Sequence, residues 1–398
     1  MGKFKRFDYY YKLQRKVLKY RALYGADFRK TALRLAFWTA SSALRRVPST
    51  VERDENALNV GLFFTGGLGD YLIAANYFGY LKRFVEDAPV KFSLFAASPG
   101  TARAAFGDLI DERPFVPRRF DLAISTARFP LVERVDRVRV ERFCPKLTTL
   151  IDAYRALEAE QPLIFTLPPY GDGIANALSI VRGQIRLQQP DVGGILGIGT
   201  DFDVEIPAPT DEDAILRKFG LDGKTFVTLN RGIDAGAKSA ESTKMWPLDY
   251  YVRLVADLKR AFPERTFVQL GVSPERSPKI EGVDVDLVGR TNLDEVKILL
   301  KRAESHIDGE GGMTHLRRAM KGGPSVVLFG PTEPALYGYP QNLNLRASFC
   351  RACEWADPNW SVVCPRTGGK AECMSRLTPE FVVEKVVEFW RRSGGRAE

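Results

Sequence analysis

The chain has 398 residues, of which 45% are hydrophobic and 27% are charged. This composition is typical of a globular protein and excludes a disordered chain or a small disulfide-stapled module. The length accommodates two domains of ordinary size. The net charge is +9, but residues 1–50 alone carry 13 Lys or Arg and two acids, which leaves −2 for residues 51–398. A near-neutral body argues against nucleic acid as a partner.

The basic segment, residues 1–57, is predicted to be an amphipathic helical arm. Leu13, Val17, Tyr20 and Tyr24 recur at helical spacing beside several lysines and arginines. Two interpretations stay open: a solvated helix docked on the body, or a helix lying on an anionic membrane surface. No apolar run approaches the roughly 20 residues that a membrane-spanning helix needs. The start also lacks the features of a secretory signal, so we expect a cytoplasmic protein, peripheral at the inner membrane if the arm binds lipid.

Residues 58–208 are predicted to form a first domain with a parallel, doubly wound sheet. Short apolar runs are expected as strands at 59–64 (NVGLFF), 90–97 (VKFSLFAA) and 120–125 (FDLAIS). A glycine-rich turn and an amphipathic helix follow the first of them. Alternation of buried strands with helices is the pattern of an α/β fold.

A second α/β domain is predicted for residues 209–377, after a proline-containing linker at 202–209 (FDVEIPAP). Its strands and helices alternate almost without interruption from 224 to 330. The last segment, residues 378–398, is a helix with Thr378 as its cap and Pro379 in its first turn, expected to pack back toward the first domain. Two such sheets facing each other would bind a ligand at the carboxyl ends of their strands.

The turn GGLGD lies between the first strand and its helix and is the first candidate site. Gly67 and Gly69 let the backbone approach a ligand, and a helix N-terminus favours an anion. Asp70 has two interpretations: a capping residue, or a carboxylate that takes a proton from a hydroxyl.

The stretch GEGGMTHL is the second candidate site. It follows a short predicted strand and opens a helix, so free backbone N–H groups and the positive end of the helix dipole would face a diphosphate. The residues assigned to this site are Glu310, Gly311, Gly312, Thr314 and His315. With only two histidines in the chain, His315 is not expected to be a metal ligand; it would donate to the diphosphate or brace the loop. Lys244, before Trp-Pro, can reach the same anion, although on this segment alone an ordinary exposed lysine explains the pattern as well.

These segments together resemble the lipopolysaccharide heptosyltransferases of glycosyltransferase family 9. The resemblance runs from about residue 59 to the C-terminal helix. It is most specific at residues 287–334, LVGRTNLDEVKILLKRAESHIDGEGGMTHLRRAMKGGPSVVLFGPTEP. The resemblance implies a GT-B fold, with two Rossmann-like domains: an acceptor-binding N-terminal one and a nucleotide-sugar-binding C-terminal one.

The resemblance also implies roles for individual residues in an inverting sugar transfer without a catalytic metal. Asp70 would be the general base on the acceptor hydroxyl, and Lys244 would contact the donor phosphates. Glu275 matches the acid that holds the ribose, and Thr291 falls where the base is recognised. Asn230 and Arg231, in the loop after the first strand of the donor domain, would approach the pyrophosphate.

One departure from the family pattern concerns the sugar. Where the common pattern has Asp-Thr-Gly, this chain has Glu310-Gly311-Gly312. The acid is longer and a hydroxyl is lost, so the donor need not be ADP-heptose.

Four of the five cysteines fall in one stretch: Cys350, Cys353, Cys364 and Cys373. The CxxC pair followed by two more cysteines is typical of a four-thiolate site for zinc or a single iron, which would be structural because all its positions are filled. Disulfides or unliganded thiols are the alternatives.

Three functions remain after this reading. The first is transfer of a sugar, such as heptose from ADP-heptose, to a lipopolysaccharide core or another surface glycan. The second keeps the fold but has a protein acceptor, with the arm and the cysteine loop serving docking and oligomerisation. The third is a non-catalytic sugar-nucleotide-binding protein.

Overall fold

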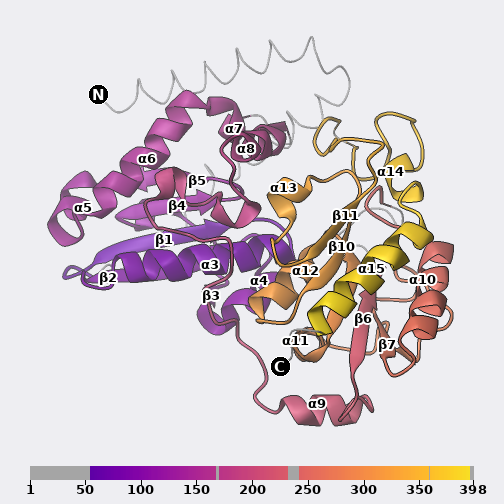
Figure 1. Ribbon diagram of the computed structural model, residues 1–398. Helices are drawn as coiled ribbons and strands as arrows, with labels where there is room; N and C mark the ends of the chain where they lie inside the picture. Colours follow the sequence, from indigo (N-terminus) through magenta and orange to yellow (C-terminus); the bar gives the residue numbers. More distant parts are fainter. Residues whose placement is uncertain (1–53, 167–169, 232–241, 358, 395–398) are drawn as a thin grey trace. The chain divides into compact units, whose positions relative to one another are not determined.

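The computed structural model describes residues 54–166, 170–231, 242–357 and 359–394 (Figure 1). Residues 53–398 form one compact unit, and nearly all of the predicted basic arm lies outside the described residues. Among the residues described, none of the helices combines the length and the apolar character needed to cross a membrane.

The first sheet has five strands in the order β3-β2-β1-β4-β5. All neighbours are parallel except β4 and β5. The three predicted strands are confirmed as β1, β2 and β4. The strands are β1 (Leu58–Phe64), β2 (Val90–Ala96), β3 (Ile110–Asp111), β4 (Leu122–Thr126) and β5 (Pro130–Val135).

Six helices accompany this sheet: α3 (Leu68–Phe84), α4 (Pro99–Phe106), α5 (Arg137–Phe143), α6 (Leu147–Glu160), α7 (Pro162–Thr166) and α8 (Tyr170–Val181). After α8 the chain runs through two short 3₁₀ turns, Arg186–Gln188 and Val192–Gly194. The first of these turns supplies a residue of the candidate site.

The second sheet is parallel throughout, with six strands in the order β11-β10-β9-β6-β7-β8. Its strands are β6 (Phe226–Asn230), β7 (Thr266–Leu270), β8 (Val285–Asp286), β9 (Ser305–Gly309), β10 (Ser325–Phe329) and β11 (Leu343–Arg346). Its helices are α9 (Glu212–Lys218), α10 (Leu248–Ala261), α11 (Leu293–Arg302), α12 (Gly312–Ala319), α13 (Pro334–Tyr337), α14 (Glu372–Ser375) and α15 (Pro379–Gly394).

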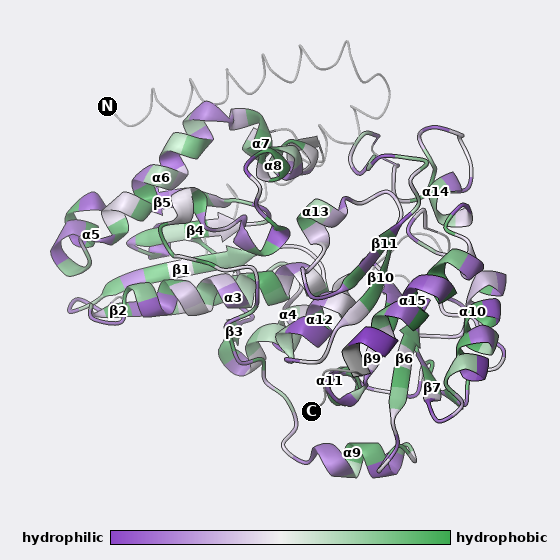
Figure 2. Cartoon of the chain, in the orientation of Figure 1, coloured by the Kyte–Doolittle hydropathy of each residue, from purple (hydrophilic) through white to green (hydrophobic). Residues whose placement is uncertain are grey.

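Both sheets have hydrophobic central strands, as the colouring of β1, β6 and β10 shows (Figure 2). Burial on both faces explains these nearly continuous apolar runs. The larger core is not confined to one sheet, because it contains Leu62 of β1, Leu72 of α3 and Leu316 of α12. The two sheets are therefore joined by apolar packing at α3 and α12.

The C-terminal helix α15 packs on α10 rather than toward the first sheet, so this expectation from the sequence was wrong (Figure 1). Its apolar positions Val382, Val386 and Trp390 are buried in the same core as Trp246 and Leu254. The helix therefore belongs to the half that carries the second sheet.

The linker predicted at 202–209 is tied to both halves. The backbone N–H of Asp203 donates to Asn76 of α3 at 2.8 Å. The carbonyl of Pro207 accepts from Lys297 of α11 at 2.6 Å. Phe202, only 2% exposed, is buried in the larger core. The segment is thus a fixed strap within the described residues and not a loose connection.

Candidate functional site

Asp70 lies in the first turn of α3, directly after the carboxyl end of β1. The strand β1 pairs with β2 on one side and with β4 on the other, so the strand order reverses at this point. Ligands of open parallel sheets bind outside the carboxyl ends of the strands at such a switch point. Gly67 and Gly69 flank Leu68 in the same turn.

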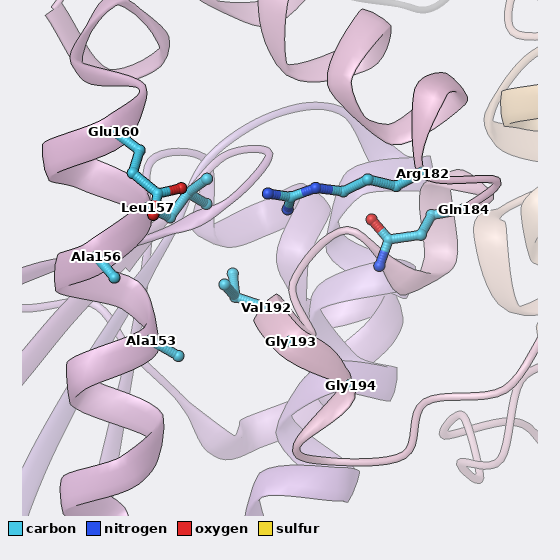
Figure 3. Close-up of a pocket in the computed structure, with 9 residues that line it drawn as sticks. All are labelled: Ala153, Ala156, Leu157, Glu160, Arg182, Gln184, Val192, Gly193 and Gly194. Carbon is cyan, nitrogen blue, oxygen red and sulfur yellow. The ribbon is translucent and has the colours of Figure 1, made fainter.

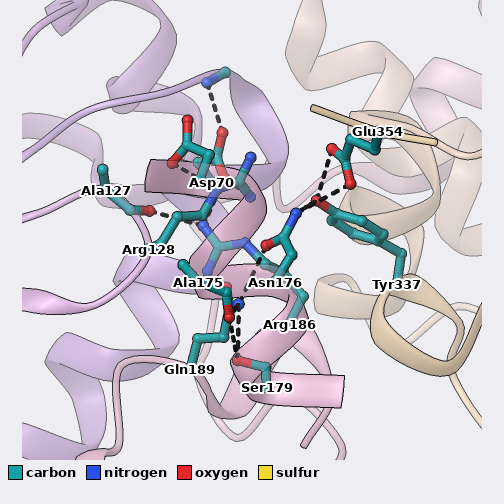
Figure 4. A network of polar contacts seen from close by, with 12 residues as sticks. Asp70, Ala127, Arg128, Ala175, Asn176, Ser179, Arg186, Gln189, Tyr337 and Glu354 are labelled. Atoms are coloured by element: carbon teal, nitrogen blue, oxygen red, sulfur yellow. Dashed lines mark hydrogen bonds and ion pairs between the residues drawn. The ribbon is translucent and has the colours of Figure 1, made fainter. Parts of the chain in front are cut away.

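The Asp70 carboxylate has three partners (Figure 4). One oxygen accepts from the backbone N–H of Gly67 at 3.1 Å, as a capping residue would. The other oxygen accepts from Arg186 at 2.7 Å and pairs with Arg128 at 3.5 Å. Burial raises the pKa of Asp70, but the charges of Arg128 and Arg186 outweigh burial and hold it below the ordinary value. The capping contact of Asp70 is therefore present in the structure, and its role as a base stays a prediction.

The two arginines are candidate site residues that the motifs missed. Arg128 follows β4 and also pairs with Asp172 of α8 at 3.3 Å. Its place after a strand end is the same signal that identified Asp70, so it was available in the sequence. Arg186 is 2% exposed and comes from a 3₁₀ turn more than 100 residues after Asp70, where no local pattern marks it.

Asn230 and Arg231 lie at the carboxyl end of β6, where the order of the second sheet reverses between β6 and β9. The Asn230 amide donates to Asp308 of β9 at 3.0 Å. The guanidinium of Arg231 donates to the carbonyl of Trp246 at 3.2 Å. Both predicted residues thus lie at the edge of the sheet where a ligand would bind.

Lys244 and Glu310 form an ion pair, with the ammonium 2.6 Å from the carboxylate. Glu310 is buried and Lys244 is half-buried. Burial raises the pKa of Glu310, yet the Lys244 charge and its hydrogen bond bring the net pKa below the ordinary value. The long acid that distinguishes this chain therefore holds the lysine that the resemblance assigns to the donor phosphates.

Helix α12 begins at Gly312, after Glu310 and Gly311. The Thr314 hydroxyl donates to the carbonyl of Gly311 at 2.7 Å, so it closes the turn in this structure. His315 is buried in the first turn of the helix. Burial lowers its pKa to about 4 despite the nearby acids Glu310 and Asp70, which keeps the ring neutral at pH 7.

The first turns of α3 and α12 touch each other, and two glycines allow it. A Cβ on Gly69 would lie 2.6 Å from Cδ2 of His315, and a Cβ on Gly312 would lie 3.2 Å from Leu68. A side chain at either position would push the two turns apart. The contact brings Asp70 and His315, which come from the two predicted sites, to one place.

Glu275 and Thr291 are not part of this group. Glu275 is exposed in the loop after β7, and Thr291 is half-buried just before the Asn292 cap of α11. Among the described residues neither is hydrogen-bonded to Lys244 or Glu310. Their predicted roles toward ribose and base stay predictions.

A second polar cluster joins α8 to the segments after β10 (Figure 4). The Asn176 amide donates to the Tyr337 hydroxyl and to Glu354, each at 3.0 Å. The Tyr337 hydroxyl donates to Glu354 at 2.9 Å. Burial raises the pKa of Glu354, although Lys244 and Arg128 act to lower it. No sequence motif marks this cluster, because its members come from three separate segments.

The cysteine-bearing segment 350–373 braces the Lys244 region. The Thr243 hydroxyl donates to the carbonyl of Trp360 at 2.8 Å, and the Trp360 ring lies 5.7 Å from the Lys244 ammonium. All five cysteines are free thiols. The pKa of Cys353 rises to about 11, through burial and then the neighbouring Cys373, Cys350 and Cys364. Within the described residues, however, no three ligand side chains have the geometry of a metal site.

A pocket of about 310 Å³ lies elsewhere, between α6 and the segment 182–194 (Figure 3). Alanine, leucine and valine side chains line it, with one carboxylate and one guanidinium. None of the predicted site residues contributes to it. The lining residues are Ala153, Ala156, Leu157, Glu160, Arg182, Gln184, Val192, Gly193 and Gly194.

Comparison with known proteins identifies the second half of the chain. Residues 229–368 match the profile of glycosyltransferase family 9 (heptosyltransferase). Over 198 residues the chain is 26% identical to lipooligosaccharide heptosyltransferase 2 of Haemophilus influenzae; this match covers 46% of the chain and 53% of that protein. The chain thus matches about half the length of this curated relative.

Two solved structures are similar in fold. The dodecameric iron-containing heptosyltransferase TibC in complex with ADP-D-β-D-heptose has a TM-score of 0.52 at 14% identity, covering 86% of this chain and 78% of that chain. TibC of enterotoxigenic E. coli H10407 has a TM-score of 0.51 at 17% identity, covering 89% and 82%. At these identities they show the fold. The resemblance read from the sequence is confirmed over residues 229–368, which match the profile of glycosyltransferase family 9 (heptosyltransferase), and the chain shares the GT-B fold of the two TibC structures.

Proposed function

We propose that this chain is an inverting glycosyltransferase that moves a heptose from ADP-heptose to a lipopolysaccharide core. Residues 58–208 would bind the acceptor, and residues 209–377 would bind the nucleotide sugar. The observation that carries the proposal is the contact of α3 with α12. It places a carboxylate, Asp70, beside the turn that a diphosphate would occupy.

In the proposed reaction Asp70 accepts the proton of the acceptor hydroxyl as its oxygen attacks the anomeric carbon. The bond from that carbon to the diphosphate breaks on the opposite face, so the configuration inverts. Negative charge then develops on the departing diphosphate. Lys244, the N-terminal N–H groups of α12 and His315 would stabilise this charge, and a preorganised arrangement of this kind supplies much of an enzyme's acceleration.

The donor is proposed on two grounds. The matching family profile is that of heptosyltransferases, and the structure of TibC, which shares the fold, was solved with ADP-D-β-D-heptose. Asn230, Arg231 and Glu310 would surround the diphosphate and the sugar, and Glu275 and Thr291 would hold the nucleoside. Because the Glu310–Gly311–Gly312 turn lacks the threonine of the common family pattern, GDP- and UDP-sugars are tested beside ADP-heptose.

The acceptor follows from the relative in Haemophilus influenzae, which is a lipooligosaccharide heptosyltransferase. A protein acceptor is the second candidate, with the basic arm and the cysteine loop serving docking and oligomerisation. On the lipid reading, residues 1–50 would hold a cytoplasmic enzyme against anionic lipid at the inner membrane.

For the cysteine loop we propose a structural zinc or iron held by Cys350, Cys353, Cys364 and Cys373. Four thiols on one loop are a donor set that suits either ion. In this structure they do not stand in coordinating geometry, so binding of the ion would have to draw them together. Metal analysis of the purified protein tests this. One ion per chain should be lost in Cys353→Ser and retained in Cys144→Ala, whose thiol lies in the first core; absence of metal from the wild type would refute it.

The function is tested by incubating the full-length protein with ADP-heptose, or with GDP- or UDP-sugars, and a lipopolysaccharide core acceptor. Heptose transfer with inversion at the anomeric carbon supports the proposal. Transfer to a polypeptide but not to the glycan would favour the second candidate. Binding of a nucleotide sugar without transfer to either acceptor would leave a non-catalytic binding protein.

A further inference from the structure

Tyr339, which lies outside the predicted motifs, contacts the Nδ1 side of the His315 ring. Its hydroxyl lies 2.6 Å from Nδ1 of His315, and the two rings meet edge to face at 86°. Tyr339 is 3% exposed and His315 is 5% exposed. The hydrogen bond is therefore shielded from water and short.

The direction of this hydrogen bond follows from the donor inventory. A buried phenol O–H needs an acceptor, since leaving a buried donor unsatisfied destabilises the fold. Among the described residues, Nδ1 of His315 is the acceptor within reach of the Tyr339 hydroxyl. Burial raises the pKa of Tyr339, so the phenol keeps its proton. The phenol therefore donates, and Nδ1 accepts.

A neutral imidazole that accepts at Nδ1 carries its proton on Nε2. The edge formed by Cδ2 and Nε2 is the one that lies against Gly69, in the turn that leads to Asp70. Four charged groups act on the ring electrostatically: Glu310, Asp70, Arg186 and Lys244.

Tyr339 is itself held in place by the strap between the two halves. The Phe202 ring packs on it with centroids 6.0 Å apart. Two neighbours of Phe202 are anchored as well: Asp201 pairs with Arg318 of α12 at 2.7 Å, and Asp203 bonds to α3. The strap thus fixes the tyrosine against the first turn of α12.

We propose that Tyr339 is a positioning residue that fixes neutral His315 as the Nε2–H tautomer, so that the ring offers a donor where α3 meets α12. This inference rests on the proposed function only for the identity of the group that accepts from Nε2, the departing diphosphate. The assignment of the tautomer itself needs no substrate.

Because the chain has only two histidines, an NMR spectrum of the selectively ¹⁵N-histidine-labelled protein contains the nitrogen signals of only two imidazole rings. His306, whose Nδ1 lies 2.9 Å from the Thr228 hydroxyl, is the internal reference. His315→Gln removes one set of signals and so assigns the other. In the wild-type protein at pH 7, His315 should show a protonated Nε2 and an unprotonated Nδ1.

Tyr339→Phe should then mix the two tautomers of His315 while leaving the His306 signals unchanged. Tyr337→Phe is the matched control, since its hydroxyl contacts Asn176 and Glu354 instead of the histidine, and it should leave the Nδ1 signal of His315 in place. In the transfer assay Tyr339→Phe should lower kcat about tenfold and leave the KM for the nucleotide sugar within about twofold. The reason is that the Nε2–H group of His315 interacts with charge that develops only in the transition state.

Two results would overturn the inference: a wild-type His315 protonated on Nδ1, or a His315 spectrum that Tyr339→Phe does not change. Loss of transfer activity is a separate matter. A wild-type protein that transfers no sugar but shows the expected tautomer would refute the proposed function and support the role of Tyr339 in fixing the ring.

Discussion

Among single residues, the carboxylate of Asp70 is the group on which the proposed reaction depends first. Two arginines keep it ionised, and the same pairing weakens it as a base. We infer that this is tolerable because the acceptor hydroxyl loses its proton only as it attacks, when proximity matters as much as basicity. The Asp70 side chain is 27% exposed, so it is not sealed off from an acceptor.

Asp70→Asn should lower kcat by roughly 10²–10⁴-fold, the usual contribution of a general base. The amide retains the size of the side chain but cannot take a proton. Asp222→Asn, an exposed turn residue, is the matched control and should transfer sugar at the wild-type rate. A kcat for Asp70→Asn within threefold of wild type would contradict the assignment.

The lowered pKa of His315 makes the free energy of unfolding depend on pH. Its pKa is about 4 in the folded chain, against an ordinary value of 6.5, so the unfolded chain binds the extra proton between these values. Stability is therefore complete above about pH 6.5 and is lost as the pH falls toward 4. The pKa of Asp70 is lowered in the folded chain, so protonation of Asp70 reduces stability only when the pH falls below the ordinary pKa of an aspartate.

Urea unfolding at pH 7 and pH 5 measures this effect. The wild type should lose about 2 kcal/mol more than His315→Gln over that interval. Equal losses in the two proteins would show that the histidine is not held neutral. For the same reason kcat should show no ionisation from His315 between about pH 5 and 8.

Among the helices and strands, α11 depends on a residue of another helix at its C-terminus: the buried guanidinium of Arg317 binds its last carbonyl groups. Arg317 of α12 is fully buried and donates to the carbonyls of Leu300, Ala303 and Gly323, among others. The last carbonyls of a helix lack partners within the helix, so Arg317 supplies them. This contact fixes α11 to the helix that carries His315.

Arg317→Met should lower the free energy of unfolding by about 3 kcal/mol or more, because several buried carbonyls lose their donors at once. Urea unfolding measures the change. Arg260→Met, on an exposed face of α10, should stay within about 0.5 kcal/mol of wild type. A change of less than 1 kcal/mol for Arg317→Met would mean that water replaces the guanidinium.

The strands were predictable from sequence because buried parallel strands leave short apolar runs between turns, as at β1, β4 and β10. The antiparallel edge strand β5 was not predictable, because Glu133 and Arg134 interrupt its apolar pattern.

Among the candidate site residues, Asp70, Lys244 and His315 could be predicted because glycines or a Trp-Pro mark their turns. Arg186 and Tyr339 reach the same place only through the folded chain, so no local pattern could indicate them.

Across the whole molecule the charge is uneven: residues 1–50 carry +11 and residues 51–398 carry −2. The proposed membrane contact and the proposed sugar transfer therefore belong to different parts of the chain and should be separable by truncation. Residues 53–398 contain both sheets and the site residues, and form one compact unit.

A chain lacking residues 1–52 should no longer sediment with vesicles that contain phosphatidylglycerol, and it should still transfer sugar to a soluble acceptor. Electrostatic attraction to anionic lipid is screened by salt, so binding of the full chain should weaken as the ionic strength rises. Vesicles of phosphatidylcholine alone are the control. Undiminished sedimentation of the shortened chain would place the membrane contact elsewhere.

The most direct test of the central claim is calorimetric titration of the full-length protein with ADP-heptose, with GDP- and UDP-sugars and with the free nucleoside diphosphates, alongside Lys244→Ala and the exposed control Lys224→Ala. The account predicts that ADP-heptose and ADP bind, that Lys244→Ala weakens both at least tenfold, and that Lys224→Ala binds as wild type does. Absence of binding by every nucleotide, or affinity unchanged in Lys244→Ala, would contradict it.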